Sequence, residues 1–297
     1  MTAHPLLNPS LPKAINAELN QFASPRAGRL AYYSDTSARG RPLLLVHSIN
    51  AAPSSREMQP LFEHYRGRRP VHSLDLPGFG QSERGNRPYS PALYAAAIDD
   101  LLEHIGDGPA DVLALSLSAE FAARAALAAP ERIASLVLIS PSGFSRRPLP
   151  PPAVGRAAHG VLTAPGLGQG LFGLVRSRPS IRFYLNKSFI GEAPNALVDY
   201  AYQTSHQPDA RYAPLMFLSS QLFTANAVEA LYERLTDLPV LAIADRDPYI
   251  SFERLPEVAA IMPNWHYERV APHMGLPHWE QPDATFAVLE RFWGESA

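Results

Sequence analysis

The stretch DVLALSLSAEFAARAALAAP, residues 111–130, joins a short apolar run to an alanine-rich segment through a turn that contains a serine. Residues 112–115 are continuously apolar, which is typical of a strand buried on both faces of a sheet. Residues 118–129 carry apolar side chains at helical spacing, and alanine favours a helix. The stretch therefore predicts a strand, a sharp turn that holds Ser116, and a helix.

Similar short apolar runs occur on both sides of this stretch. They are continuous rather than alternating, which again favours strands buried on both faces of a parallel sheet. A second helical pattern covers residues 91–105. Strands that alternate with helices predict a doubly wound α/β fold with a mostly parallel sheet. The other predicted strands are residues 43–47, 71–76, 135–139 and 240–244.

Length and composition are consistent with one large globular unit. The chain has 297 residues, of which 46% are hydrophobic and 18% are charged, and its formal net charge is −2. This apolar content is too high, and the net charge too small, for a disordered chain. Open α/β folds reach this length as one unit. A net charge near zero also argues against a nucleic-acid-binding surface.

Several kinds of site are excluded or unsupported. The chain has no cysteine, which excludes disulfides, thiolate metal sites and a cysteine nucleophile. The ten histidines are scattered without a ligand motif, so we expect no metal. The GLGQG stretch at 166–170 lacks the lysine of a phosphate loop and is interpreted as a turn, so we expect no cofactor. Neither a signal peptide nor a membrane-spanning run is recognisable, which predicts a cytoplasmic protein without a membrane span.

Residues 144–236 interrupt the alternation of strands and helices. This segment opens with the proline-rich SRRPLPPP, continues through glycine-rich turns, and has no strand-like run before Leu238. Helical patterns within it cover residues 195–205 and 214–234. We therefore predict that this segment is a helical insertion, or cap. The predicted α/β core comprises residues 1–143 and 237–297.

Five segments of the chain, in this order, resemble motifs of the α/β-hydrolase superfamily. Residues 43–55 resemble its first core strand and oxyanion loop, and residues 75–84 resemble its Asp-x-Pro-Gly-x-Gly-x-Ser signature. Residues 111–144 resemble the nucleophile elbow with its helix and the following strand. Residues 238–248 resemble the strand that carries the catalytic acid, and residues 275–293 resemble the last helix. The resemblance implies an α/β-hydrolase fold with an inserted cap.

The resemblance also implies roles for individual residues. Ser116 corresponds to the nucleophile, and Asp247 to the acid that orients a base; Asp245 matches the spacing less well. A base is needed because a serine hydroxyl is a poor nucleophile at neutral pH. The backbone amides of Ile49 and Leu117 correspond to the oxyanion hole, where one donor stabilises the developing charge by about 3–4 kcal/mol.

The catalytic histidine is the point at which the chain departs from the pattern. The family usually ends in Gly-His-x-x-x-x-Glu-x-Pro, and alignment on the last Glu and Pro puts Gly275 at the histidine position. His273 lies two residues earlier and His278 three residues later, so either one reaches Ser116 only if the loop is rearranged. We favour His278, because its Pro-His-Trp-Glu setting matches the family better. A structural role for His278 is an equal alternative.

Three interpretations of function stay open. Ala114 and Ser118 replace the elbow glycines, Ser48 replaces a glycine of the oxyanion loop, and Gly275 replaces the histidine. These departures all fall at catalytic positions, and the fold also hosts lyases and cofactor-free oxygenases. The chain is therefore a serine hydrolase acting on an ester or related acyl bond, an altered enzyme of another class, or a ligand-binding protein without turnover. We place the serine hydrolase first, because the nucleophile and the acid are present.

The cap segment is rich in apolar and aromatic side chains that we expect to face the site or the interior of the cap. Collectively they favour a small apolar or mixed substrate over a highly charged one. They are Phe183, Tyr184, Phe189, Tyr200, Tyr202, Met216, Phe217 and Phe223.

Overall fold

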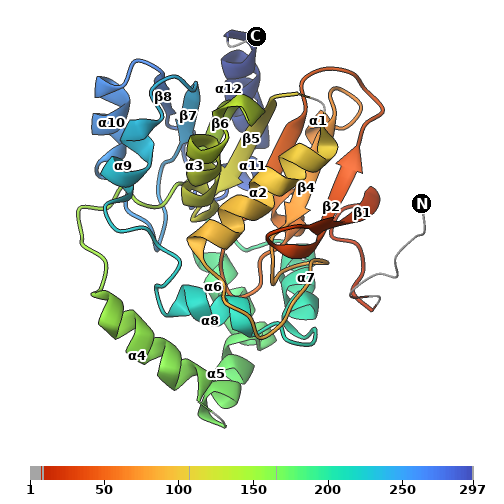
Figure 1. Ribbon diagram of the computed structural model, residues 1–297, viewed down its shortest axis with the longest axis vertical. Helices are drawn as coiled ribbons and strands as arrows, with labels where there is room; N and C mark the ends of the chain where they lie inside the picture. The colour runs from red at the N-terminus through yellow and green to blue at the C-terminus, as the bar shows by residue number, and fades with distance from the viewer. Residues whose placement is uncertain (1–7, 9, 107, 165, 296–297) are drawn as a thin grey trace.

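A computed structural model of the chain describes residues 8, 10–106, 108–164 and 166–295 (Figure 1). These residues contain one eight-stranded sheet with the strand order β1-β2-β4-β3-β5-β6-β7-β8. The strands are β1 (Glu18–Ser24), β2 (Gly28–Asp35), β3 (Leu43–Val46), β4 (Val71–Asp75), β5 (Ala110–Leu115), β6 (Ile133–Ile139), β7 (Val240–Ile243) and β8 (Trp265–Glu268).

The sheet is parallel from β4 to β8, and β1 and β2 join it as antiparallel strands at one edge. Helices are found on both faces of this sheet (Figure 1). This architecture confirms the predicted α/β-hydrolase fold.

The helices connect and cover the strands in chain order. They are η1 (Ser55–Met58), α1 (Gln59–Tyr65), α2 (Pro91–Ile105), α3 (Ser118–Ala128), η2 (Pro130–Arg132), α4 (Pro152–Thr163), α5 (Leu167–Val175), α6 (Arg178–Lys187), α7 (Asn195–Ser205), α8 (Tyr212–Leu218), α9 (Ala227–Ala230), η3 (Tyr232–Arg234), α10 (Leu255–Ile261), α11 (Pro277–Glu280) and α12 (Pro282–Glu295).

Successive side chains of each central strand enter opposite halves of the core. In β3, Leu44 and Val46 belong to the cluster that includes helices α2 and α3, whereas Leu43 and Leu45 pack with α1 and α12. All four side chains are fully buried. Because the side-chain period of a strand is two, a strand buried on both faces has no polar face. This explains why the continuous apolar runs located the central strands.

Two local predictions were wrong, and the strands β1 and β2 were missed. Strand β1 is mostly polar and only partly buried, so it leaves no apolar run. Strand β2 is buried over residues 30–34, and its apolar residues were overlooked. The GLGQG stretch lies at the start of α5 rather than in a turn. Residues 214–234 are not one helical segment, since α8, α9 and η3 divide them.

Helices α4 to α9 lie between β6 and β7, within the segment predicted as a cap. In Figure 1, α4 to α8 are below the sheet, and α4 and α5 form the end of the molecule most distant from it. Among the described residues, no helix combines the length and apolarity needed to cross a bilayer.

Candidate active site

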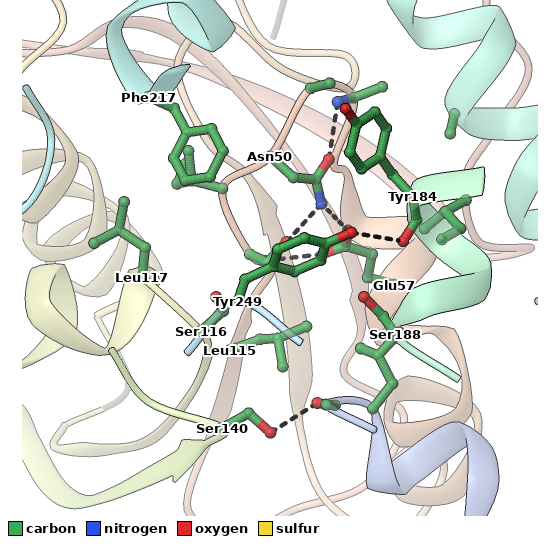
Figure 2. Close-up of a pocket in the computed structure, with 18 of the residues that line it drawn as sticks. Asn50, Glu57, Leu115, Ser116, Leu117, Ser140, Tyr184, Ser188, Phe217 and Tyr249 are labelled. Atoms are coloured by element: carbon green, nitrogen blue, oxygen red, sulfur yellow. Dashed lines mark hydrogen bonds between the residues drawn. The ribbon is translucent and has the colours of Figure 1, made fainter. Parts of the chain in front are cut away.

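A cavity of about 360 Å³ lies between the ends of the central strands and the helices that follow β6. Ser116 and Asp247 line it from the strand side, as do Ile49 and Leu117. Figure 2 shows Ser116 between its neighbours Leu115 and Leu117 at this cavity. The opposite wall is mostly apolar and is formed by Val175, Ile181, Tyr184, Leu185, Leu197, Ala201, Phe217, Leu218 and Phe223.

Ser116 is held on a sharp turn between β5 and α3. Its φ of 59° is in the left-handed region, which is costly for a residue with a Cβ. The strain is maintained because the Ser116 N–H donates to the carbonyl of Ile139 (2.9 Å) and its carbonyl accepts from the N–H of Ala119 (3.1 Å). The backbone geometry is therefore that of the predicted nucleophile elbow, and it presents the serine at the start of a helix.

Ser118 makes a buried hydrogen bond that a glycine at this position would lack. It is fully buried, and its hydroxyl donates to the carbonyl of His47 (2.6 Å). This bond connects the elbow to the loop that carries Ile49. Neither the N–H of Ile49 nor that of Leu117 donates to another described residue, so both remain available to an oxyanion.

A buried carboxyl group that was not predicted from the sequence organises the loop that carries Ile49. Glu57 accepts the N–H of Ser48 on Oε2 (2.9 Å) and the side-chain amide of Asn50 on Oε1 (2.8 Å). Burial raises the pKa of Glu57. Figure 2 shows Asn50 and Glu57 joined by this bond at the cavity. The only sequence signal was an acidic residue in a short segment beside the predicted oxyanion loop, which is too weak to assign a role.

Asp247 projects from the loop after β7 into the space beside Gly275. Its Oδ1 accepts the N–H groups of Tyr249 (2.7 Å) and Ile250 (2.9 Å). A Cβ placed on Gly275 would lie 2.7 Å from Oδ2 of Asp247, and the φ of Gly275 is 112°. The carboxyl group thus stands where a side chain at position 275 would begin. Burial raises the pKa of Asp247 to about 6.

The structure does not bring His273 or His278 to the cavity lining. His278 is fully buried, and its Nε2 contacts the carbonyl of Glu57 (2.8 Å). His273 is also fully buried, and its Nδ1 accepts the N–H of Gly275 (3.0 Å). Burial lowers the pKa of each imidazole to about 4. Both rings therefore support the loops around the site in this conformation.

Asp245 and His47, the other polar residues near the strand ends, also have structural partners. Asp245 is outside the cavity lining and accepts from the Arg269 guanidinium (2.6 Å). His47 accepts the N–H of Leu76 on Nε2 (3.0 Å), so its Nδ1 carries the proton and donates to the carbonyl of Ser48 (2.6 Å). In the described part of the chain, no group of three His, Asp or Glu side chains forms a metal-binding cluster.

The sequence profile of the Alpha/beta hydrolase family matches residues 43–288, which include every residue placed in the cavity so far. This chain belongs to the alpha/beta hydrolase family. The membership agrees with the strand order, the elbow at Ser116 and the position of Asp247 after β7.

Curated relatives match only part of this alpha/beta hydrolase. The (Lyso)-N-acylphosphatidylethanolamine lipase of Mus musculus is 31% identical over 114 residues, which are 37% of this chain and 33% of the lipase. A pimeloyl-[acyl-carrier protein] methyl ester esterase of Aliivibrio fischeri (strain MJ11) is 31% identical over 115 residues, 37% of this chain and 40% of the esterase. The matches thus span less than half the length of either relative.

Solved structures agree in fold over nearly the whole length. A serine hydrolase involved in carbazole degradation, the CarC enzyme, superposes with a TM-score of 0.74 at 13% identity. The match covers 93% of this chain and 99% of that one. At this level of identity the likeness demonstrates the fold alone.

Proposed function

We propose that this alpha/beta hydrolase cleaves an ester or related acyl bond of a small apolar or mixed substrate through an acyl-enzyme at Ser116. The observation that carries the proposal is the strained elbow, which presents the Ser116 hydroxyl to a largely apolar cavity. A left-handed serine is costly, and such strain is typical of functional sites. The names of the curated relatives, an esterase and a lipase, support the same class of reaction.

In this mechanism Oγ of Ser116 attacks the acyl carbon, and the carbonyl oxygen becomes an oxyanion. The N–H groups of Leu117 and Ile49 receive that charge, since both amides are available. The alcohol then leaves with a proton, and water attacks the acyl-enzyme to release the acid and restore the serine. Glu57 positions the loop of Ile49 through its bonds to Ser48 and Asn50.

The proton acceptor in this proposal is Asp247, which takes the place of an imidazole. Its carboxyl group fills the position where a side chain at 275 would begin, and it lines the same cavity as Ser116. A carboxyl group with a pKa near 6 is mostly ionised at neutral pH yet basic enough to hold a proton briefly. A water molecule in the cavity is able to relay the proton from the serine. His273 or His278 would act as base instead only after its loop moved into the cavity.

A second candidate function is ligand binding or non-hydrolytic chemistry at the same cavity. It is favoured by one specific observation, since none of the histidines that the structure describes lines the cavity. The described lining of the cavity therefore does not include the usual general base of a serine hydrolase. An apolar cavity of this size would still bind a small molecule.

The two candidates are separated by labelling and turnover. The purified chain is incubated with a fluorophosphonate probe and with p-nitrophenyl esters, beside the variants Ser116→Ala, Asp247→Asn, His273→Ala and His278→Ala. We expect labelling and turnover in the wild type and neither in Ser116→Ala. Loss of activity in one histidine variant that melts at the wild-type temperature and still binds the ester would assign the base to that histidine rather than to Asp247. A wild type that binds ligands but neither labels nor turns over would establish the second candidate.

We also propose that residues 144–236 act as a cap and that the protein works in the cytoplasm on a small molecule. The cap role is supported by the wall that α5 to α8 contribute to the cavity. Tyr249 lies beside this wall in Figure 2, and its hydroxyl donates to the carbonyl of Tyr184 in α6 (3.5 Å). Limited proteolysis with and without a bound ester analogue tests the cap, because occupancy would protect the segment from cleavage.

A further inference from the structure

Exposed apolar side chains are concentrated on one segment of the molecule. Eleven large hydrophobic residues are exposed among those that the structure describes, and eight of them lie between residues 149 and 190. Single exposed apolar residues are ordinary, but a gathering of this kind marks an interaction surface. The eight are Leu149, Val154, Val161, Leu171, Leu174, Phe183, Tyr184 and Ile190.

The same segment has a strongly one-sided charge. Residues 145–191 contain no Asp or Glu, although the whole chain has a net charge of −2. They contain seven basic residues: Arg146, Arg147, Arg156, Arg176, Arg178, Arg182 and Lys187.

Acidic partners from elsewhere neutralise only part of this charge. Arg146 pairs with Glu257, and Arg178 pairs with Asp199. Arg182 donates to a neutral amide oxygen. The surface therefore keeps a net positive charge beside its apolar side chains.

The helices arrange the apolar side chains on outward faces. Val154 and Val161 of α4 are seven residues apart, so two helical turns bring them to the same side. Gly155 instead packs against the end of α8, since a Cβ there would lie 2.8 Å from the carbonyl oxygen of Ser219. In α5, Leu174 is 69% exposed and follows Leu171 by three residues. Figure 1 shows both helices at the end of the molecule away from the sheet.

We infer that the surface of α4, α5 and α6 docks on an anionic lipid bilayer. Apolar side chains flanked by arginine and lysine are the pattern of helices that lie in a membrane interface. Basic residues near such a surface are attracted by its negative potential. The neighbouring residues Val175, Ile181 and Tyr184 line the cavity, so an apolar molecule that leaves the bilayer at this face meets the cavity wall.

Charge decides between a bilayer and a second copy of the chain. Two copies joined through this face would oppose two surfaces that both lack acidic residues from 145 to 191. Such like-charge contacts are unfavourable, whereas an anionic bilayer supplies the opposite sign. The docking depends on neither Ser116 nor Asp247, so its test is independent of the proposed hydrolase activity.

Vesicle flotation with the full chain tests this inference. Vesicles of phosphatidylcholine alone are compared with vesicles that also contain about 30% phosphatidylglycerol, which gives them a negative surface potential. We expect the wild type to float with the anionic vesicles and much less with the neutral ones. Leu174→Glu should raise the apparent Kd at least tenfold, and Arg156→Gln should raise it about fivefold, the equivalent of one basic residue.

Matched controls exist elsewhere on the chain. Ile261 of α10 is also 69% exposed, so Ile261→Glu should leave flotation unchanged, as should Arg39→Gln at an exposed loop. Val161→Glu is the second apolar variant if Leu174→Glu does not fold, as judged by circular dichroism. Equal binding to both vesicle types, or equal effects of the Leu174 and Ile261 variants, would overturn the inference. A wild-type dimer that Leu174→Glu dissociates, without vesicle binding, would show that a second copy covers this face.

Discussion

The two oxygens of Asp247 have different surroundings. Oδ1 is fixed by two backbone N–H groups, whereas Oδ2 faces Gly275 at the cavity. The backbone bonds favour the ionised form, but burial outweighs them and raises the pKa from 3.8 to about 6. Between these two values the folded state holds a proton that the unfolded state has released. The contribution of Asp247 to the free energy of unfolding therefore falls as the pH rises from about 4 to about 6, and it stays unfavourable above pH 6.

Asp247→Asn should consequently separate stability from activity. The asparagine oxygen still accepts from Tyr249 and Ile250, but the buried charge is gone, so the free energy of unfolding at pH 7 should rise by about 1–3 kcal/mol. Ester hydrolysis should fall at least about 100-fold, because a proton acceptor is lost. Urea unfolding and kcat/KM measured on the same preparation check both expectations.

Asp245→Asn is the matched control two residues away. This carboxylate pairs with Arg269 and does not line the cavity. Its removal should lower stability and leave activity within a factor of a few. If Asp247→Asn lowers stability as Asp245→Asn does, the unfavourable burial inferred for Asp247 is refuted.

At the scale of elements, the short helix η1 holds the loop of Ile49, the proposed oxyanion loop, through Glu57. Both carboxylate oxygens act as acceptors, one for the N–H of Ser48 and one for the amide of Asn50. Glu57→Gln leaves one acceptor and introduces a donor that faces another donor. We expect a loss of about 1–3 kcal/mol in unfolding free energy and a decrease of about 100-fold in kcat/KM.

Glu63→Gln provides the comparison, because Glu63 is exposed on the adjacent helix α1. Thermal melts and steady-state kinetics of both variants should show a change only at Glu57. An active, stable Glu57→Gln protein would mean that the loop holds its shape without the carboxylate.

The sequence predicted the central strands, which are buried on both faces, and missed the polar edge strand β1 and its neighbour β2. Runs such as residues 136–139 are apolar throughout, because both of their faces meet the core. Strand β1 is polar at an edge, so its pairing with β2 leaves no apolar signature. In α5 the glycines suggested a turn, but Gly168 is buried against α4 and the segment is helical.

The candidate site was predictable only where a residue follows a strand directly. The positions of Ser116 and Asp247 depend on local order along β5 and β7, which a sequence pattern records. The role of Glu57 depends on a contact between η1 and the oxyanion loop, and the rings of His273 and His278 are directed by packing. Whether a histidine ring lies in a cavity or behind its wall depends on tertiary packing, which the spacing of residues in the sequence does not reveal.

At the scale of the whole molecule, buried neutral histidines make stability depend on pH. His47, His273 and His278 are fully buried, and burial lowers the pKa of each to about 4 from an ordinary value of 6.5. Between pH 4 and 6.5 the unfolded chain therefore binds protons that the folded chain does not. Their contribution to stability is complete above pH 6.5 and is lost as the pH falls toward 4.

His278→Gln isolates one of these contributions. The glutamine amide is able to replace the donor to the Glu57 carbonyl but does not titrate. When the pH falls from 7 to 5, one such histidine lowers the free energy of unfolding by about 2 kcal/mol. The free energy of unfolding of His278→Gln should therefore fall by about 2 kcal/mol less than that of the wild type over this range. Urea unfolding at the two pH values measures it, with His206→Gln at an exposed position as the control. A wild-type pH dependence retained by His278→Gln would show that this imidazole is not held neutral, and would reopen its candidacy as the base for Ser116.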